Sequence, residues 1–135
     1  MKDEVAILVV DDELMMRELL AKILSRDGYQ VRTAEDGVAA LEVLRKEKIS
    51  IVLSDLKMPR MGGFDLLKAV KSEFPGVGMV MMTSYGDTYT VKDALLLGAD
   101  EYIVKPFKNY EISMVVERAY WRLLSESHEV TTEAE

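Results

Sequence analysis

The sequence predicts an α/β protein built on a single doubly wound, five-stranded parallel sheet. Two observations carry this prediction. Five short apolar runs alternate along the chain with segments of helical periodicity, and four of these runs end at residues suited to phosphate chemistry. Successive strands joined by helices form parallel pairs with right-handed crossovers. Helices must cover both faces of such a sheet, so the winding reverses once, and we predict the strand order 2-1-3-4-5.

Composition limits what the chain can do. Its 135 residues suggest one domain with a sizeable core. The net charge of −7 argues against direct nucleic-acid binding. There is no cysteine, and no apolar run is long enough to cross a membrane. The first residues lead straight into an apolar run without a signal peptide, so we expect a cytoplasmic protein.

Each expected strand is a short run rich in apolar and β-branched residues. VAILVV at the start is the clearest, and GMVMM in the second half is bounded by Pro75-Gly76 before it and a polar loop after it. In chain order, we expect strands at residues 5–10, 29–33, 50–54, 78–82 and 101–104.

The expected helices show apolar residues at intervals of three and four and end at glycine or proline. The first stops at Asp27-Gly28, the third at Pro75-Gly76 and the fourth at Gly98. Residues 56–63 contain a proline and two glycines and are expected to be a loop. In chain order, the helices are expected at 13–27, 36–47, 64–74, 88–97 and 108–124. The whole is a flavodoxin-like (βα)5 arrangement over residues 4–124, followed by a polar tail or the start of a linker at 125–135.

Polar side chains follow four of the strands where each strand ends. Asp11 and Asp12 follow the first strand, Asp55 the third, Thr83 the fourth and Lys105 the fifth. The carboxyl ends of parallel strands share one edge of the sheet, where ligands of this architecture bind. We therefore expect three carboxylates, a hydroxyl and an ammonium to meet there.

Three neighbouring carboxylates need a cation or a bound proton. At about 4 Å and an effective dielectric near 20, each charged pair costs roughly 4 kcal/mol. Oxygen ligands in a solvent-accessible site suit Mg²⁺, which keeps several waters and bridges to phosphate. Asp55, alone at the end of the central strand, is the candidate nucleophile that would form an acyl phosphate. Lys105 and the Thr83 hydroxyl would hold phosphoryl oxygens.

Four motifs together resemble the response-regulator receiver domains of two-component signalling: VVDDE at 9–13, SDLKMPRMGGFDLL at 54–67, MTSYGD at 82–87 and GADEYIVKPF at 98–107. The similarity extends over residues 5–123. It implies a phosphoacceptor switch, and no enzyme with a separate substrate. Asp55 would receive phosphate from a histidine kinase, a phosphotransfer protein or a small phosphodonor. The VERA segment at 116–119 is similar to receivers of nitrogen-regulation-type transcriptional activators.

The resemblance also implies roles for single residues. Asp12, Asp55 and the backbone carbonyl of Lys57 would bind Mg²⁺, with Asp11 acting largely through water. The Lys105–Pro106 bond would be cis. Phosphorylation would move Thr83 and turn Tyr102 inward. This would alter the face formed by the fourth helix, fifth strand and fifth helix, where a homodimer or another output partner would bind.

Two positions depart from the usual family residues. A lysine at 57 and a tyrosine at 85 stand where the family tunes hydrolysis of the acyl phosphate. We expect Lys57 and Tyr85 to obstruct attacking water and prolong the phosphorylated state.

Three other functions fit parts of the pattern. A Mg²⁺-dependent phosphatase of the haloacid-dehalogenase type would need an acid two residues after the nucleophile, where this chain has Lys57. A flavin-binding electron carrier would need a Ser-, Thr- and Gly-rich phosphate loop after the first strand, where Asp11 and Asp12 stand instead. An inactive receiver could serve as a pure interaction module, but the acceptor-site residues are all present.

Overall fold

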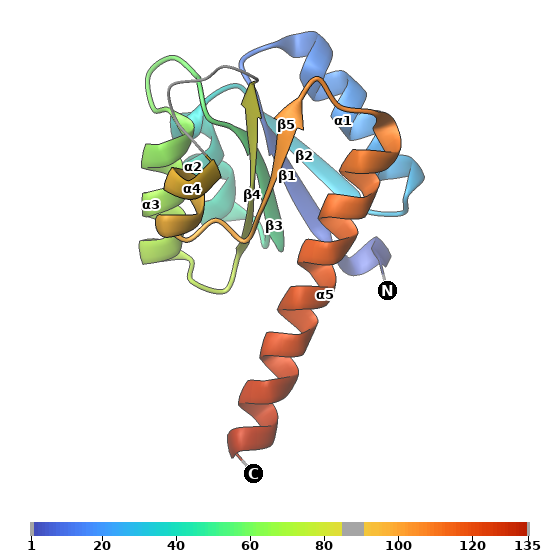
Figure 1. Cartoon of the computed structure of the whole chain (residues 1–135), viewed down its shortest axis with the longest axis vertical. Coiled ribbons are helices and arrows are strands. Elements are labelled where there is room, and N and C mark those ends of the chain that lie inside the picture. The colour runs from blue at the N-terminus through green and yellow to red at the C-terminus, as the bar shows by residue number, and fades with distance from the viewer. Residues whose placement is uncertain (1, 85–90, 135) are drawn as a thin grey trace.

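The five apolar runs form one parallel sheet in the order β2-β1-β3-β4-β5, as predicted (Figure 1). This arrangement is seen in a computed structural model, which describes residues 2–84 and 91–134. The strands are β1 (Ala6–Val10), β2 (Gln30–Ala34), β3 (Ile51–Asp55), β4 (Gly78–Ser84) and β5 (Glu101–Lys105).

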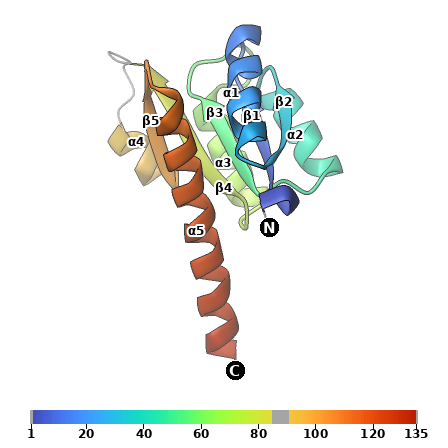
Figure 2. The ribbon, with the colours of Figure 1, turned by 90° about the vertical axis from the view of Figure 1, so that its right-hand side faces the viewer.

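Helices cover both faces of the sheet (Figures 1 and 2). The described helices are a short 3₁₀ turn η1 (Lys2–Glu4), then α1 (Leu14–Arg26), α2 (Gly37–Lys46), α3 (Gly63–Glu73), α4 (Val91–Leu96) and α5 (Asn109–Ala134). Alternate residues of β1 separate two apolar cores. Ile7 and Val9 pack with α1 and α5, whereas Leu8 and Val10 pack with α2, α3 and α4.

Burial on both faces explains why the central strands read as unbroken apolar runs. Every residue of β1 and β3 is buried, while the edge strand β2 leaves most of its residues at least partly exposed. A strand covered on one face only would alternate polar and apolar residues. The same burial holds the strand register firmly, because a shift by one residue would turn each side chain to the other core.

Some element boundaries differ from those expected. β4 continues to Ser84, so Thr83 lies within the strand and not in the loop after it. The expected end of the last helix at residue 124 is wrong, because α5 continues to Ala134. Residues 125–134 contain no glycine or proline, so nothing in the backbone stops the helix there. The expected fourth helix began at 88, and its first residues fall outside the described part of the chain.

The strand ends define where chemistry can occur. The carboxyl ends of β1, β3, β4 and β5 all lie at the upper edge of the sheet in Figure 1.

In the part of the chain that the structure describes, no helix combines the length and apolar character needed to span a membrane.

Candidate functional site

Three aspartates meet at the upper edge of the sheet. β1 and β3 are neighbours, and Val10 pairs with Ser54, so Asp11 and Asp55 emerge side by side. One carboxylate oxygen from each of Asp11, Asp12 and Asp55 lies within 4.8 Å of the other two. Asp11 and Asp55 are buried, and Asp12 is exposed. The group is therefore a cluster of oxygen ligands that is open to solvent on the Asp12 side.

Lys105 reaches this cluster from β5, across the intervening strand β4. Its Nζ donates to Asp11 Oδ2 at 2.8 Å and to Asp55 Oδ2 at 3.4 Å. The lysine side chain is only 13% exposed. Burial alone would lower the pKa of Lys105, but the hydrogen bond to Asp11 and the charges of both aspartates raise it overall. Lys105 is thus an ammonium that bridges two buried carboxylates.

The surroundings of Asp55 disfavour its ionised form. Burial raises the pKa of its carboxyl, and the negative charge of Asp11 raises it further. The charge and hydrogen bond of Lys105 oppose this rise, as does a hydrogen bond from the backbone N–H of Lys57. The pKa is still raised overall, so one ammonium does not fully compensate the carboxylate. An additional positive charge beside Asp55 would stabilise its ionised form.

Asp11 is held in place on both sides of its carboxylate. Its Oδ1 accepts the backbone N–H of Glu13 at 2.9 Å, while its Oδ2 faces Lys105. The Arg17 guanidinium donates to the Asp11 backbone carbonyl at 2.7 Å. We did not predict these contacts from the sequence, although an aspartate accepting a backbone N–H two residues later is a common local motif. They leave Asp11 with a fixed orientation toward the site.

The loop after Asp55 packs closely against the end of β3. The N–H of Gly63, the first residue of α3, donates to the carbonyl of Leu56 at 2.9 Å. A Cβ built on Gly63 would collide with the backbone carbonyl of Asp55. Only glycine allows this approach, so α3 begins directly under Asp55.

A second set of contacts ties the same loop to α2. Arg60, whose φ of 63° is rare for a residue with a side chain, donates to the carboxylates of Asp36 and Glu35. Asp36 is fully buried and also caps α2 by accepting the Ala39 N–H at 2.9 Å. This cap, together with Arg60, lowers the pKa of Asp36 despite its burial. The loop that carries Lys57 is therefore anchored at its base by Gly63 and within the loop by Arg60.

The remaining residues singled out from the sequence lie around the cluster. Thr83 is 4% exposed within β4, beside the strand end of Asp55. Tyr102 on β5 is 39% exposed, so its ring lies at the surface. Lys57 is exposed and lines a shallow cavity with Asp12 and Pro59. The Lys105–Pro106 bond is cis, as the resemblance implied. Tyr85 falls outside the described residues.

Comparisons with known proteins point to one family. The family model described as "Response regulator receiver domain" matches residues 7–117. Sporulation initiation phosphotransferase F of Bacillus subtilis is 36% identical over 112 residues, which are 83% of this chain and 90% of that protein. Transcriptional regulatory protein ZraR of Klebsiella oxytoca is 36% identical over 134 residues, covering 98% of this chain and 30% of that protein.

Solved structures of similar proteins show the same family resemblance. The chain superposes on NtrX from Brucella abortus, crystallised in complex with ADP, with a TM-score of 0.87 and 36% identity. The match covers 93% of this chain and 29% of NtrX. The chain thus spans most of the sporulation protein but less than a third of ZraR and NtrX. The likeness to nitrogen-regulation-type receivers is consistent with these last two matches.

The charge balance of the cluster yields opposite predictions for two substitutions in metal-free protein. Lys105→Met should lower the free energy of unfolding by about 2–3 kcal/mol, because it leaves buried carboxylates without their counter-ion. Asp55→Asn should raise it by about 1 kcal/mol, because it removes the excess negative charge and keeps the side-chain shape. Urea denaturation at neutral pH with a chelator present measures both.

Lys108→Met is the matched control for loss of a lysine, because Lys108 is exposed and lies three residues beyond the site lysine. It should change stability by no more than about 0.5 kcal/mol. Changes of the same sign in Lys105→Met and Asp55→Asn would contradict this account of the cluster.

Proposed function

The chain belongs to the family of response regulator receiver domains of two-component systems, and on this premise we propose that Asp55 is its phosphoacceptor. The phosphoryl group would come from the phosphohistidine of a sensor histidine kinase or a phosphotransfer protein, or from a small phosphodonor. The observation that carries the proposal is the cluster of Asp11, Asp12 and Asp55, with Lys105 bound to its two buried members.

The transfer is a simple displacement. A carboxylate oxygen of Asp55 attacks phosphorus, and the bond between phosphorus and the imidazole nitrogen breaks with its electron pair leaving on the nitrogen. Such reactions require alignment and neutralisation of charge more than covalent assistance from the protein. Asp55 lies at the centre of the sheet edge, where β3 and the glycine at the start of α3 hold its backbone fixed.

The donor set fits Mg²⁺. Three carboxylates face a single ammonium, so two negative charges are left over, and all available side-chain ligands are oxygens. Asp12, Asp55 and the backbone carbonyl of Lys57 would hold the ion, with Asp11 contributing largely through water. When bound, Mg²⁺ supplies the positive charge that allows a phosphoryl group to approach Asp55.

Lys105 and Thr83 would bind the transferred group. Lys105 is already an ammonium and needs only to turn from the aspartates toward the new oxygens. Thr83 lies on β4, beside the end of β3, and its hydroxyl can donate to a phosphoryl oxygen. Burial of both side chains excludes water that would weaken these bonds.

The signal that the domain passes on would be a change in the shape of its surface. We propose that Thr83 moves toward the phosphoryl group and that the exposed Tyr102 ring turns inward, altering the face formed by α4, β5 and α5. That face would then control an output partner or an attached domain. The domain would not turn over a separate substrate, and its acidic charge leaves nucleic-acid binding to other parts of a longer protein. A cytoplasmic location fits such a role.

Incubation with acetyl phosphate and Mg²⁺ should add one phosphoryl group to the chain, which intact mass spectrometry detects. Asp55→Asn should gain none, and neither should the wild-type chain in excess chelator. The asparagine variant keeps the shape of the site, so its failure to react would not reflect unfolding. Labelling of this variant, or an unlabelled wild-type chain, would refute the assignment of Asp55.

Binding of a phosphoryl analogue such as beryllofluoride should shift the backbone amide resonances of residues 83–84 and of α4, β5 and α5. The reason is that Thr83 and Tyr102 connect the acceptor to that face. Two-dimensional NMR of ¹⁵N-labelled protein measures the shifts, and Asp55→Asn serves as the unresponsive control. Amide shifts confined to the loops around Asp55 would argue against the switch.

Lys57→Ala and Tyr85→Ala should each shorten the lifetime of the phosphorylated chain several-fold, because both side chains are proposed to obstruct attacking water. Loss of label from purified phosphoprotein over time gives the rate. Lys48→Ala, an exposed lysine before the opposite end of β3, is the control and should leave the rate unchanged. Equal or slower decay in the two test variants would reject the role of these residues.

A further inference from the structure

An arginine in the loop after Asp55 pairs with a carboxylate that is buried at the start of α2. The Asp36 side chain is only 1% exposed, and one of its oxygens accepts a hydrogen bond from the Arg60 guanidinium. Its other oxygen accepts the Ala39 N–H at 2.9 Å. The same guanidinium nitrogen of Arg60 also donates to Glu35 at 3.1 Å. Both oxygens of the buried carboxylate are thus satisfied, one by α2 and the other by the loop.

The position of Arg60 is unfavourable apart from these contacts. Its φ of 63° lies in the left-handed region, where a residue with a Cβ is strained and glycine is not. Its positive charge also lies at the N-terminal end of α2, where the helix dipole favours anions. The charges of Asp36 and Glu35 therefore hold the loop in a backbone conformation that an arginine by itself disfavours.

A second pair of residues fits the loop to the same end of α2. The Gly37 N–H donates to the backbone carbonyl of Met61 at 3.2 Å. A Cβ built on Gly37 would lie 2.6 Å from the Met61 side chain, so this side chain packs directly against the first residue of the helix. We call these two contacts, Arg60 with Asp36 and Met61 with Gly37, the loop latch.

The latched loop also borders the aspartate cluster. Lys57 and Asp12 line one shallow cavity, together with Pro59, which directly precedes Arg60. The ring of Pro59 fixes its own φ, so little backbone freedom separates the latch from Lys57. A change in how the loop sits on α2 would therefore move the backbone at Lys57.

The influence of Arg60 on the site is geometric. The charges that shift the pKa of Asp55 most are those of Lys105 and Asp11. The guanidinium of Arg60 is instead neutralised by the two carboxylates beside α2. Its effect on the cluster therefore passes through the shape of the loop.

We propose that Arg60 is a positioning residue for Mg²⁺: by fixing the loop on α2, it holds the backbone carbonyl of Lys57 in place beside Asp12 and Asp55. This inference rests on the proposed function, in which that carbonyl is a ligand of the ion. Arg60 touches neither the ion nor the phosphoryl group. Residues that orient metal ligands from behind commonly change metal affinity roughly ten- to a hundredfold when they are replaced.

Arg60→Gly and Asp36→Asn break the ion pair of the latch by different routes. Glycine removes the guanidinium and relieves the left-handed φ, whereas asparagine removes the charge and still caps α2. Each should raise the dissociation constant for Mg²⁺ at least about fivefold, because the loop then holds the ligating conformation only part of the time. The double variant should bind no more weakly than either single variant, since both changes act on one contact.

Isothermal titration calorimetry with magnesium chloride, without any phosphodonor, measures these constants. Arg60 is 62% exposed, so its replacement leaves the apolar cores intact, and circular dichroism verifies that each variant is folded. A latch that only stabilises the fold would lower the urea midpoint and leave the dissociation constant for Mg²⁺ unchanged.

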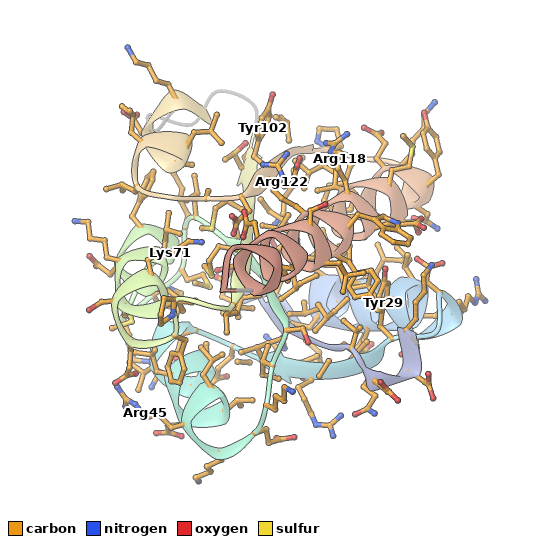
Figure 3. All side chains as sticks on the ribbon, turned by 90° about the horizontal axis from the view of Figure 1, so that it is seen from below. Tyr29, Arg45, Lys71, Tyr102, Arg118 and Arg122 are labelled. Carbon is orange, nitrogen blue, oxygen red and sulfur yellow. The ribbon has the colours of Figure 1, made fainter. Side chains whose placement is uncertain are left out.

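Glu73→Gln is the matched control. Glu73 pairs with Arg45 at 3.2 Å, so this variant also breaks an ion pair between an arginine and a carboxylate, one that joins α2 to α3. Arg45 belongs to the last turn of α2, at the end away from the aspartates (Figure 3, seen from that end). The control variant should bind Mg²⁺ with the affinity of the wild type.

The acetyl phosphate reaction gives a second readout that separates affinity from chemistry. Arg60→Gly and Asp36→Asn should each need at least about fivefold more Mg²⁺ for half-maximal labelling. At saturating Mg²⁺ they should reach the wild-type rate, because Asp55, Lys105 and Thr83 are unchanged.

Wild-type affinity for Mg²⁺ in either folded variant would overturn the proposal, as would an equal loss of affinity in Glu73→Gln. A wild-type chain that binds no Mg²⁺ would overturn both this proposal and the proposed metal site. Mg²⁺ binding that depends on Arg60, in a chain that is never labelled at Asp55, would refute the phosphoacceptor alone and support the role of Arg60.

Discussion

The excess of negative charge at the sheet edge is the constraint on which the rest of the structure depends. Asp11 and Asp55 are removed from water, and only Lys105 compensates them from within the described site. Burial strengthens each of these electrostatic interactions. With the exposed Asp12 included, three carboxylates face one ammonium, which leaves two negative charges in excess. A cation bound beside these carboxylates would make the arrangement more favourable.

The fold supplies the rigidity needed to hold these charges in place. β1 and β3 are buried on both faces, and two separate apolar cores fix their register. The loop after Asp55 is closed by Gly63 beneath Asp55 and by Arg60 on the capped end of α2. Each of these contacts involves backbone or a buried partner and so restrains the loop beside Asp55. The stability of the cores offsets the cost of the charged cluster.

The sequence was sufficient for the topology and for the residues that gather at the edge, because both follow from where apolar runs end. It was not sufficient for contacts made by loops. The Arg60–Asp36 pair joins residues that only the tertiary fold brings together, and the bond from Lys105 to Asp11 depends on the path of a long side chain across β4. The sequence predicts too early an end for α5, because the polar composition of residues 125–134 is also typical of an unstructured tail. In a helix without glycine or proline, polarity predicts exposure, and the backbone continues.

β5 connects the aspartate cluster at the sheet edge with helix α5. Lys105 at one end of this five-residue strand contacts the aspartates, and Glu101 at the other end holds the arginines of α5. If Lys105 changed partner and β5 moved with it, the displacement would reach α5 through Glu101. Glu101 lies about 13 Å from Lys105 at the rise of an extended strand. Coupling of this kind is reciprocal. A partner that fixes the direction of α5 would, through the same strand, bias the position of Lys105 in the site.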